Sequence, residues 1–134
     1  MVSRQTVESW IALYERAWRT GGTGLLSALF SEDASYRMSP YEDPAVGPAA
    51  IGELWERERE GPDEEFEISH ELVAVEADTA VVRVAVEYGR GTRYRDLWIV
   101  RFAGDGRCAE FEEWPFWPGQ PISPDQSRPP ATGA

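Results

Sequence analysis

The stretch that decides the fold is Thr92–Trp117, with the sequence TRYRDLWIVRFAGDGRCAEFEEWPFW. Side chains of different character alternate along both of its halves, and Gly104-Asp105-Gly106 lies between the halves. Such runs on either side of a glycine-containing turn are typical of a β-hairpin. We therefore predict two long strands joined by that turn.

Alternation divides the side chains of each predicted strand between two faces of a sheet. In the first strand one face carries Tyr94, Asp96, Trp98, Val100 and Phe102, and the other carries Arg93, Arg95, Leu97, Ile99 and Arg101. In the second strand one face carries Ala109, Phe111, Glu113 and Pro115, and the other carries Cys108, Glu110, Glu112 and Trp114. Asp96 and Glu113 thus fall on faces that are otherwise largely aromatic or apolar, and this placement is the main functional clue.

The bulk properties limit the class of protein. The chain has 134 residues, a net charge of −11 and a single cysteine, Cys108. Its length suits one domain, and its negative charge argues against binding to nucleic acid. A lone thiol excludes an internal disulfide. The first residues, MVSRQTVESW, lack an apolar core of signal-peptide length and no run approaches membrane-spanning length, so we expect neither a signal peptide nor a membrane span. We predict a protein of the cytoplasm.

The rest of the chain supplies helices first and strands afterwards. Helical spacing of apolar residues predicts a first helix from Arg4 to Thr20, capped by Ser3 and ended by Gly21-Gly22. Further predicted elements are a short helix in Gly24–Phe30, a strand in Ala34–Ser39, a proline-rich loop in Pro40–Pro48, a helix from Ala49 to Glu60, and strands in Phe66–Ala77 and Thr79–Gly89.

This order predicts an α+β fold. With the hairpin, the last four strands form an antiparallel meander. A strongly curved sheet with helices on its concave side buries the apolar faces of both the strands and the helices. The curvature leaves a conical space between the first helix and the sheet. We assign residues 1–117 to a single domain and expect residues 118–134, which are rich in proline, to form a mobile or surface-draped tail.

Four pieces of sequence carry a resemblance. They are the end of the first helix, Tyr14-x3-Trp18-x2-Gly21, the segments LxxLFSEDASY (Leu26–Tyr36) and GPAAIGELW (Gly47–Trp55), and the terminal hairpin. In this order the chain resembles the nuclear-transport-factor-2-like superfamily, which includes SnoaL-like polyketide cyclases, ketosteroid isomerases and limonene epoxide hydrolases. The resemblance covers residues 4–117 and implies a cone fold, a fold that hosts many chemistries and many non-enzymes.

Comparison with the ketosteroid isomerases argues against steroid isomerisation by their mechanism. The resemblance matches Tyr14 to their tyrosine oxyanion donor. Their aspartate base falls on Met38 or Ser39, and their protonated second acid falls on Trp98. Two of the three functional groups are therefore missing.

Comparison with the cyclases and epoxide hydrolases points to Glu113. It falls where these families carry a catalytic aspartate that faces the cavity. The hydrolases add an arginine and a second aspartate on the neighbouring strand. Asp96 is on that strand, but Arg93 and Arg95 alternate to the other face unless a bulge turns one inward. This chemistry implies no cofactor and no metal, and His70 alone supplies no ligand cluster.

Two readings of the acids remain open. An apolar cavity would raise the pKa of Glu113 by desolvation, and Asp96 nearby would oppose ionisation of both, which suits a general acid and base with a rate effect of roughly 10²–10⁴-fold. Alternatively, either acid pairs with Arg37, Arg93 or Arg95, or lies in water at the rim. An unpaired buried carboxylate costs several kcal/mol, so we expect a partner for a sequestered Asp96.

Aromatic residues are the expected walls of the cavity. The predicted pocket residues are Trp18, Tyr36, Met38, Trp55, Val84, Trp98 and Phe111, with Tyr14 as a hydrogen-bond donor. The alternative for each is plain core. Phe116 and Trp117 are expected to close one mouth of the cone or to pack against a second subunit.

The outward stripe Leu97, Ile99 and Trp114 is too apolar for free solvent and predicts a homodimer through the outer sheet face. The expected function is that of a SnoaL-like pocket protein acting on a small hydrophobic metabolite. It would be a cofactor-free isomerase, cyclase, hydratase or epoxide-hydrolase-like enzyme with Glu113 as acid or base, assisted by Asp96. The alternative is a non-catalytic ligand-binding or dimerisation module of the same fold.

Overall fold

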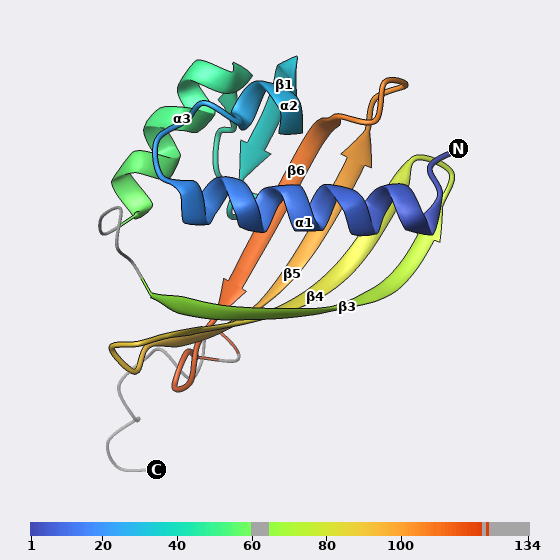
Figure 1. Cartoon of the computed structure of the whole chain (residues 1–134). Helices are drawn as coiled ribbons and strands as arrows, with labels where there is room; N and C mark the ends of the chain where they lie inside the picture. The colour runs from blue at the N-terminus through green and yellow to red at the C-terminus, as the bar shows by residue number, and fades with distance from the viewer. Residues whose placement is uncertain (60–64, 122, 124–134) are drawn as a thin grey trace, which may run out of the picture.

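The computed structural model describes residues 1–59, 65–121 and 123. It shows a curved sheet crossed by a long helix, with two further helices at one end (Figure 1). The elements are α1 (Arg4–Thr20), α2 (Leu26–Leu29), β1 (Phe30–Arg37), β2 (Ala45–Val46), α3 (Gly47–Glu58), β3 (Phe66–Glu76), β4 (Thr79–Tyr88), β5 (Arg93–Phe102) and β6 (Cys108–Phe116). The predicted α+β class is confirmed.

The strands form one sheet in the order β2-β1-β6-β5-β4-β3. Strands β3 to β6 make the predicted antiparallel meander. The sheet is mixed, however, because β1 runs parallel to β6, with Tyr36 opposite Phe111. The predicted loop also contains β2, whose residue Val46 pairs with Ser35 of β1. Both differences come from pairings between distant segments, which local alternation does not reveal.

Helix α1 has the predicted bounds because its signals are local. The Ser3 hydroxyl accepts a hydrogen bond from the Thr6 amide at 3.1 Å, and the helix ends at Gly21, where φ is 79°. Its buried side chains are Val7, Trp10, Ile11, Tyr14 and Ala17. Helix α1 lies across the concave face of the sheet (Figure 1), and its apolar stripe brings Tyr14 to Trp98 of the sheet, with ring centroids 4.6 Å apart.

Helix α3 begins two residues earlier than predicted, at Gly47, and its first turn contains Pro48. Its apolar side, Ile51, Leu54 and Trp55, is buried. A Cβ atom on Gly52 would lie 3.1 Å from Thr23 Cγ2, so this glycine allows α3 to approach the start of α2 closely. The close approach holds Trp55 against the end of α1, where it meets Trp18 with ring centroids 4.9 Å apart.

Aromatic rings fill one half of the space under α1. The Trp10 indole has five aromatic neighbours with ring centroids 5.6–6.3 Å away: Tyr14, Phe30, Trp98, Phe102 and Phe111. Its Nε1 donates to the Leu29 carbonyl at 3.0 Å, so the buried indole is satisfied. This packed half borders the site described below.

The hairpin of β5 and β6 follows the predicted alternation except at its turn. The pairing register shifts between Arg101 and Phe102, so Phe102 lies opposite Cys108. The shift turns Cys108 inward, where it is fully buried, although strict alternation predicts it on the outer face. Beyond the shift, Trp98 lies opposite Glu113 on the inner face as predicted.

Two predictions concern chain outside or at the edge of the described part. Residues 122 and 124–134 of the predicted tail, and Glu60 of the predicted third helix, lie outside the described residues. In the described part, the third helix ends at Glu58. None of the helices described is both long and apolar enough to cross a membrane.

Candidate functional site

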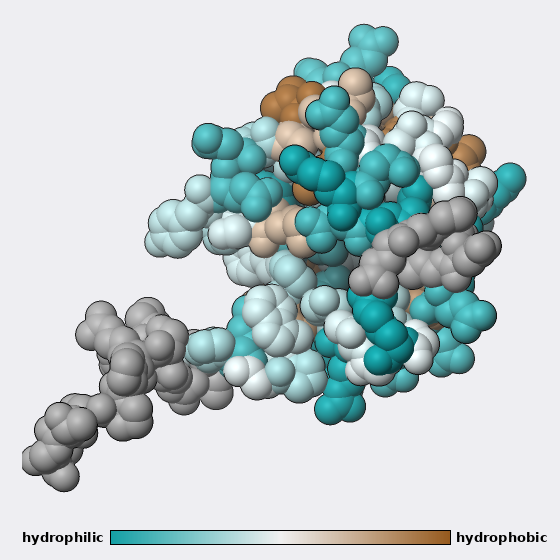
Figure 2. All heavy atoms as spheres, turned by 90° about the vertical axis from the view of Figure 1, so that its left-hand side faces the viewer, coloured by the Kyte–Doolittle hydropathy of each residue, from teal (hydrophilic) through white to brown (hydrophobic). Residues whose placement is uncertain are grey.

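A cavity of about 290 Å³ lies between α1, α3 and the sheet. Its lining residues are spread along the chain: Tyr14, Glu15, Trp18, Tyr36, Met38, Leu54, Trp55, Glu58, Phe66, Ile68, Val86, Tyr88, Arg90, Tyr94, Asp96, Trp98, Glu113, Pro115 and Trp117. Figure 2 looks onto the end of the molecule that carries α3 and the turn between β4 and β5. Hydrophilic side chains cover most of this surface, with apolar atoms visible between them.

Glu113 is held by two tyrosine hydroxyls. Tyr36 on β1 donates to Glu113 Oε2 at 2.5 Å, and Tyr14 on α1 donates to the same oxygen at 3.2 Å. The two hydroxyl oxygens are 3.4 Å apart. The parallel pairing of β1 with β6 places Tyr36 on the same face as Glu113, and the inward stripe of α1 supplies Tyr14. The carboxyl group is thereby oriented from two sides.

Both tyrosines stay protonated. Burial is the main cause that raises the pKa of Tyr14 and of Tyr36 well above the usual tyrosine value, and the charge of Glu113 raises both further. A hydroxyl that holds its proton is a permanent donor toward Glu113. The tyrosines therefore stabilise the ionised form of this carboxyl group.

Asp96 lies beside Glu113 on the same face of the sheet. Asp96 pairs with Pro115, and the next inward-facing pair along the two strands is Trp98 with Glu113. The two acids are therefore diagonal neighbours. Its side chain is 8% exposed, and its Oδ1 atom is buried without a hydrogen-bond partner. Burial, and then the charge of Glu113, raise the pKa of Asp96 to about 8.

The two acids have unequal surroundings, and this sets their protonation. Burial also raises the pKa of Glu113, and Glu58 adds to the rise, but the two tyrosine hydrogen bonds oppose it. Because Glu113 accepts two O–H donors and Asp96 Oδ1 accepts none, Glu113 is the better carboxylate. When the pair holds a single proton, this proton is therefore favoured on Asp96 and the negative charge on Glu113.

The alternative reading of the acids, an ordinary ion pair, does not hold in the described part of the chain. Among its residues, no salt bridge joins Asp96 or Glu113 to Arg37, Arg93 or Arg95. Arg93 and Arg95 are exposed, because no bulge interrupts β5 at their positions. The arrangement of two acids and an arginine seen in the resembled hydrolases is therefore incomplete here.

Most of the predicted wall residues meet at the cavity. Trp18, Tyr36, Met38, Trp55 and Trp98 line it, as do the three predicted catalytic residues Tyr14, Asp96 and Glu113. Tyr36 does more than form a wall, since it donates the shorter hydrogen bond to Glu113. Trp117 also belongs to the lining, and its ring meets Tyr94 with centroids 6.5 Å apart.

Two predicted wall residues are placed elsewhere. Phe111 is buried behind the tyrosines, 4.8 Å from the Tyr36 ring by centroids, and does not line the cavity. Val84 is buried opposite Asp96 on β4 and is also outside the lining. A position on the inner face of the sheet does not by itself place a residue at the cavity, because the rings of Trp10 and Tyr14 cover part of that face.

Several lining residues were missed by the sequence reasoning. They are Glu15, Leu54, Glu58, Phe66, Ile68, Val86, Tyr88, Arg90, Tyr94 and Pro115. Phe66 with Ile68, and Val86 with Tyr88, alternate along their strands, so the same alternation rule would have found them once the curved sheet was accepted. Glu58 is at the end of α3, and only the packing of that helix brings it to the cavity.

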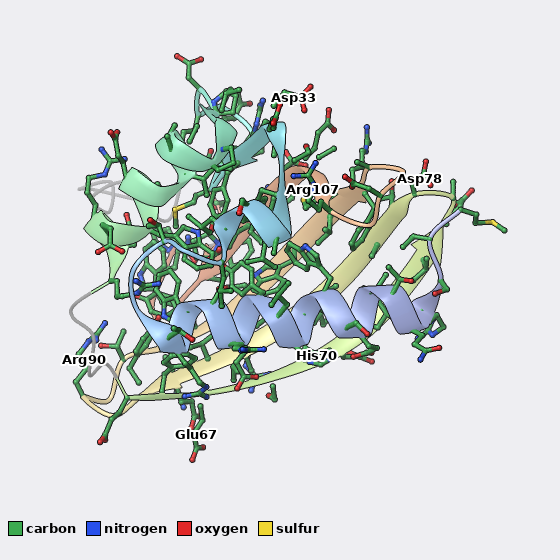
Figure 3. All side chains as sticks on the ribbon, turned by 45° about the horizontal axis from the view of Figure 1, so that its top comes forward. Asp33, Glu67, His70, Asp78, Arg90 and Arg107 are labelled. Carbon is green, nitrogen blue, oxygen red and sulfur yellow. The ribbon has the colours of Figure 1, made fainter. Side chains whose placement is uncertain are left out.

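His70 lies away from this cavity. Its Nε2 is 2.5 Å from Glu8 Oε2, and Figure 3 shows the histidine on β3 beside α1. In the part of the chain that the structure describes, no group of three or more His, Cys, Asp or Glu side chains is placed to hold a metal ion.

The fold has many counterparts among solved structures. It is similar to a proposed polyketide cyclase from Sinorhizobium meliloti, with 22% identity, a TM-score of 0.63, and coverage of 81% of this chain and 98% of the other. A ketosteroid isomerase-like protein from Erwinia carotovora atroseptica has 24% identity, a TM-score of 0.59 and coverage of 85% and 96%. A nuclear-transport-factor-2-like protein of unknown function from Mesorhizobium loti has 19% identity, a TM-score of 0.63 and coverage of 87% and 96%.

These structures are less than 25% identical to the chain and therefore show the fold alone. A search among curated proteins found no match. The sequence itself matches the model of the SnoaL-like domain over residues 10–111, which takes in most of α1, all of α3 and most of the sheet. The chain belongs to the SnoaL-like family.

Proposed function

We propose that the protein catalyses cofactor-free proton transfer on a small hydrophobic metabolite bound in the cavity, as an isomerase, cyclase or hydratase. The observation that supports this most is the pair of acids with unequal surroundings, the half-buried Glu113 and the buried Asp96, at an aromatic-walled cavity. Two titratable groups with separated protonation states can supply a base and an acid at one pH.

In the proposed step Glu113 is the base and Asp96 the acid. Glu113 removes a proton from carbon, and the electron pair of the broken C–H bond moves toward a neighbouring carbonyl oxygen. Asp96 gives its proton to that oxygen as negative charge develops on it. Both tyrosine hydrogen bonds go to Oε2 of Glu113. Oε1 accepts neither of them, so we assign Oε1 as the oxygen that takes the proton from the substrate.

A simple ketone tests this chemistry without knowledge of the natural substrate. 2-Tetralone is a flat bicyclic ketone with acidic C–H groups beside its carbonyl, and proton removal in D₂O is recorded by NMR as loss of those signals. We expect the wild-type protein to accelerate exchange and Glu113→Gln to lower the protein-dependent rate by roughly 10²-fold or more.

The matched control removes an equal charge elsewhere. Glu67 is exposed on β3 and points away from the molecule in Figure 3, so Glu67→Gln should exchange 2-tetralone at the wild-type rate. Equal rates for wild type and Glu113→Gln would contradict a base at position 113. Thermal shift against a ligand panel on the same three proteins then separates binding from turnover.

The second candidate is a binding module without turnover. It is favoured by the hydrogen bonds themselves, because two O–H donors on one carboxylate oxygen lower its basicity. Such a module would shift in melting temperature with a ligand in both wild type and Glu113→Gln, and would leave 2-tetralone exchange at the rate of buffer alone.

We propose two further properties, an assembly and a compartment, that are compatible with either function. The half-buried Leu97, Ile99 and Trp114 on the outer face support a homodimer, and Leu97 lies opposite Trp114. The single buried cysteine suits a reducing compartment such as the cytoplasm.

A further inference from the structure

The cavity carries an excess of acids. Its described lining residues include the acids Glu15, Glu58, Asp96 and Glu113 and one base, Arg90. Arg90 lies over the Tyr88 ring at 4.5 Å, in the turn between β4 and β5 at the edge of the molecule (Figure 3). Glu15 forms a salt bridge with Arg19 at 2.8 Å. The remaining acids therefore dominate the charge that a ligand meets.

Three of these acids lack a cationic partner within residues 1–59, 65–121 and 123. They are Glu58, Asp96 and Glu113, and Glu58 raises the pKa of Glu113 through its charge. Asp96 is more than nine-tenths buried, and its Oδ1 has no hydrogen-bond partner. A buried carboxyl oxygen without a donor is costly, so a ligand that brings a donor with positive charge supplies what the protein itself does not.

The walls of the cavity suit the same kind of ligand. The faces of indole and phenol rings attract cations, and the lining includes Trp18, Trp55, Tyr94, Trp98 and Trp117. Arg59 already uses two of them, with its guanidinium 5.0 Å from the Trp18 ring centroid and 5.7 Å from that of Trp55. Arg59 is outside the lining and pairs with Glu56 at 3.0 Å, so it does not neutralise Asp96 or Glu113.

We propose that the cavity selects an organic cation, a protonated amine on a flat or alicyclic apolar body, with its ammonium group at Asp96 and Glu113 and its body against the tryptophans. This inference rests on the proposed use of the cavity as a ligand site and narrows the class of substrate. Glu113, the better carboxylate of the pair, attracts the ammonium group, which donates a hydrogen bond to Asp96 Oδ1. A carboxylate ligand meets like charge from Glu113 and Glu58.

Three probes with one ring system test the charge preference. They are naphthalen-2-ylmethylamine, naphthalen-2-ylmethanol and naphthalene-2-carboxylate, titrated into the wild-type protein by isothermal calorimetry at neutral pH. We expect the amine to bind at least about tenfold more tightly than the alcohol, and the carboxylate more weakly than the alcohol. An alcohol that binds as tightly as the amine, or an amine that shows no binding at millimolar concentration, overturns the proposal.

Substitutions of the two acids test whether they cause the preference for the amine. Asp96→Asn and Glu113→Gln should each reduce the ratio of amine to alcohol affinity severalfold, and Glu67→Gln should retain it. The ratio is taken within one protein, so a loss of folded material in one variant does not change it, and the second variant provides an independent reading. A ratio unchanged in both variants overturns the proposal, because the charge selected would then lie elsewhere.

The outcome is separable from that of the proposed chemistry. Exchange of 2-tetralone without a preference for the amine overturns the charge inference and leaves proton transfer standing. A preference for the amine without exchange supports the charge inference and makes the protein a binding module for organic cations.

Discussion

At the scale of single residues, the contrast between Glu113 and Asp96 carries the account. Both acids face the cavity from adjacent strands, but Glu113 accepts two tyrosine hydroxyls and Asp96 Oδ1 has no donor. The difference between the two acids arises from the residues around them. It makes one acid lose its proton more readily than the other, so the charge of the pair depends on pH.

The raised pKa of Asp96 predicts a specific pH dependence of stability. Asp96 holds its proton up to about pH 8 in the folded state, whereas in the unfolded chain it loses the proton near the ordinary aspartate pKa of 3.8. The contribution is therefore fully present below the unfolded pKa and is lost as pH rises from about 4 to 8. Asp96→Asn keeps the shape but cannot ionise, so it should be more stable than wild type at pH 8.5 by at least about 1 kcal/mol.

Urea unfolding from pH 5 to 8.5 checks this prediction. Wild type should lose stability over that range more steeply than Asp96→Asn. Parallel curves for the two proteins would mean that Asp96 is already ionised in the folded state at neutral pH, contrary to its burial.

At the scale of elements, the features that could be predicted are those that depend on residues close together in the sequence. Alternation in β5 and β6 put Asp96 and Glu113 on the inner face, and capping and apolar spacing fixed α1. The parallel pairing of β1 with β6, the two-residue β2 and the register shift at Phe102 each depend on distant partners. The hydrogen bond from Tyr36 to Glu113 depends on that parallel pairing, so its existence could not be read from the sequence.

The junction between β2 and α3 offers a test of backbone geometry. Gly47 has a φ of 88°, and a Cβ atom there would lie 3.2 Å from the Glu32 carbonyl oxygen, a backbone atom that cannot move freely. Gly47→Ala should therefore destabilise the protein by about 1–2 kcal/mol. Gly104 has open space and no positive φ, so Gly104→Ala is the matched control and should be close to neutral in the same denaturation experiment. Equal effects of the two substitutions would refute the strain argument.

At the scale of the whole molecule, the sheet has one face covered by helices and one face without them (Figure 1). The outer face carries Leu97, Ile99 and Trp114 between charged residues, and Phe116 beside them is 50% exposed. A second copy of this chain is the occupant we propose, because a twofold interface pairs the same stripe with itself.

Light scattering coupled to size exclusion tests the assembly. We expect a mass of twice the 15.1 kDa of the chain, and Ile99→Lys should shift the protein to monomer while the cavity still binds ligand. Wild type that elutes as a clean monomer at micromolar concentration would refute the dimer. It would leave the cavity proposals intact, because every residue used in them belongs to one chain.

The central claim is that, when the two acids at the cavity hold a single proton, this proton is favoured on Asp96 and the negative charge on Glu113. Carbon-detected NMR of the side-chain carboxyl carbons, followed from pH 4 to 9.5 and assigned with Asp96→Asn and Glu113→Gln, measures this directly. We expect the Asp96 carbon to titrate near pH 8 and the Glu113 carbon to titrate at a lower pH than that of Asp96. Ordinary titration of both carbons near pH 4, or a Glu113 that holds its proton above Asp96, would contradict it.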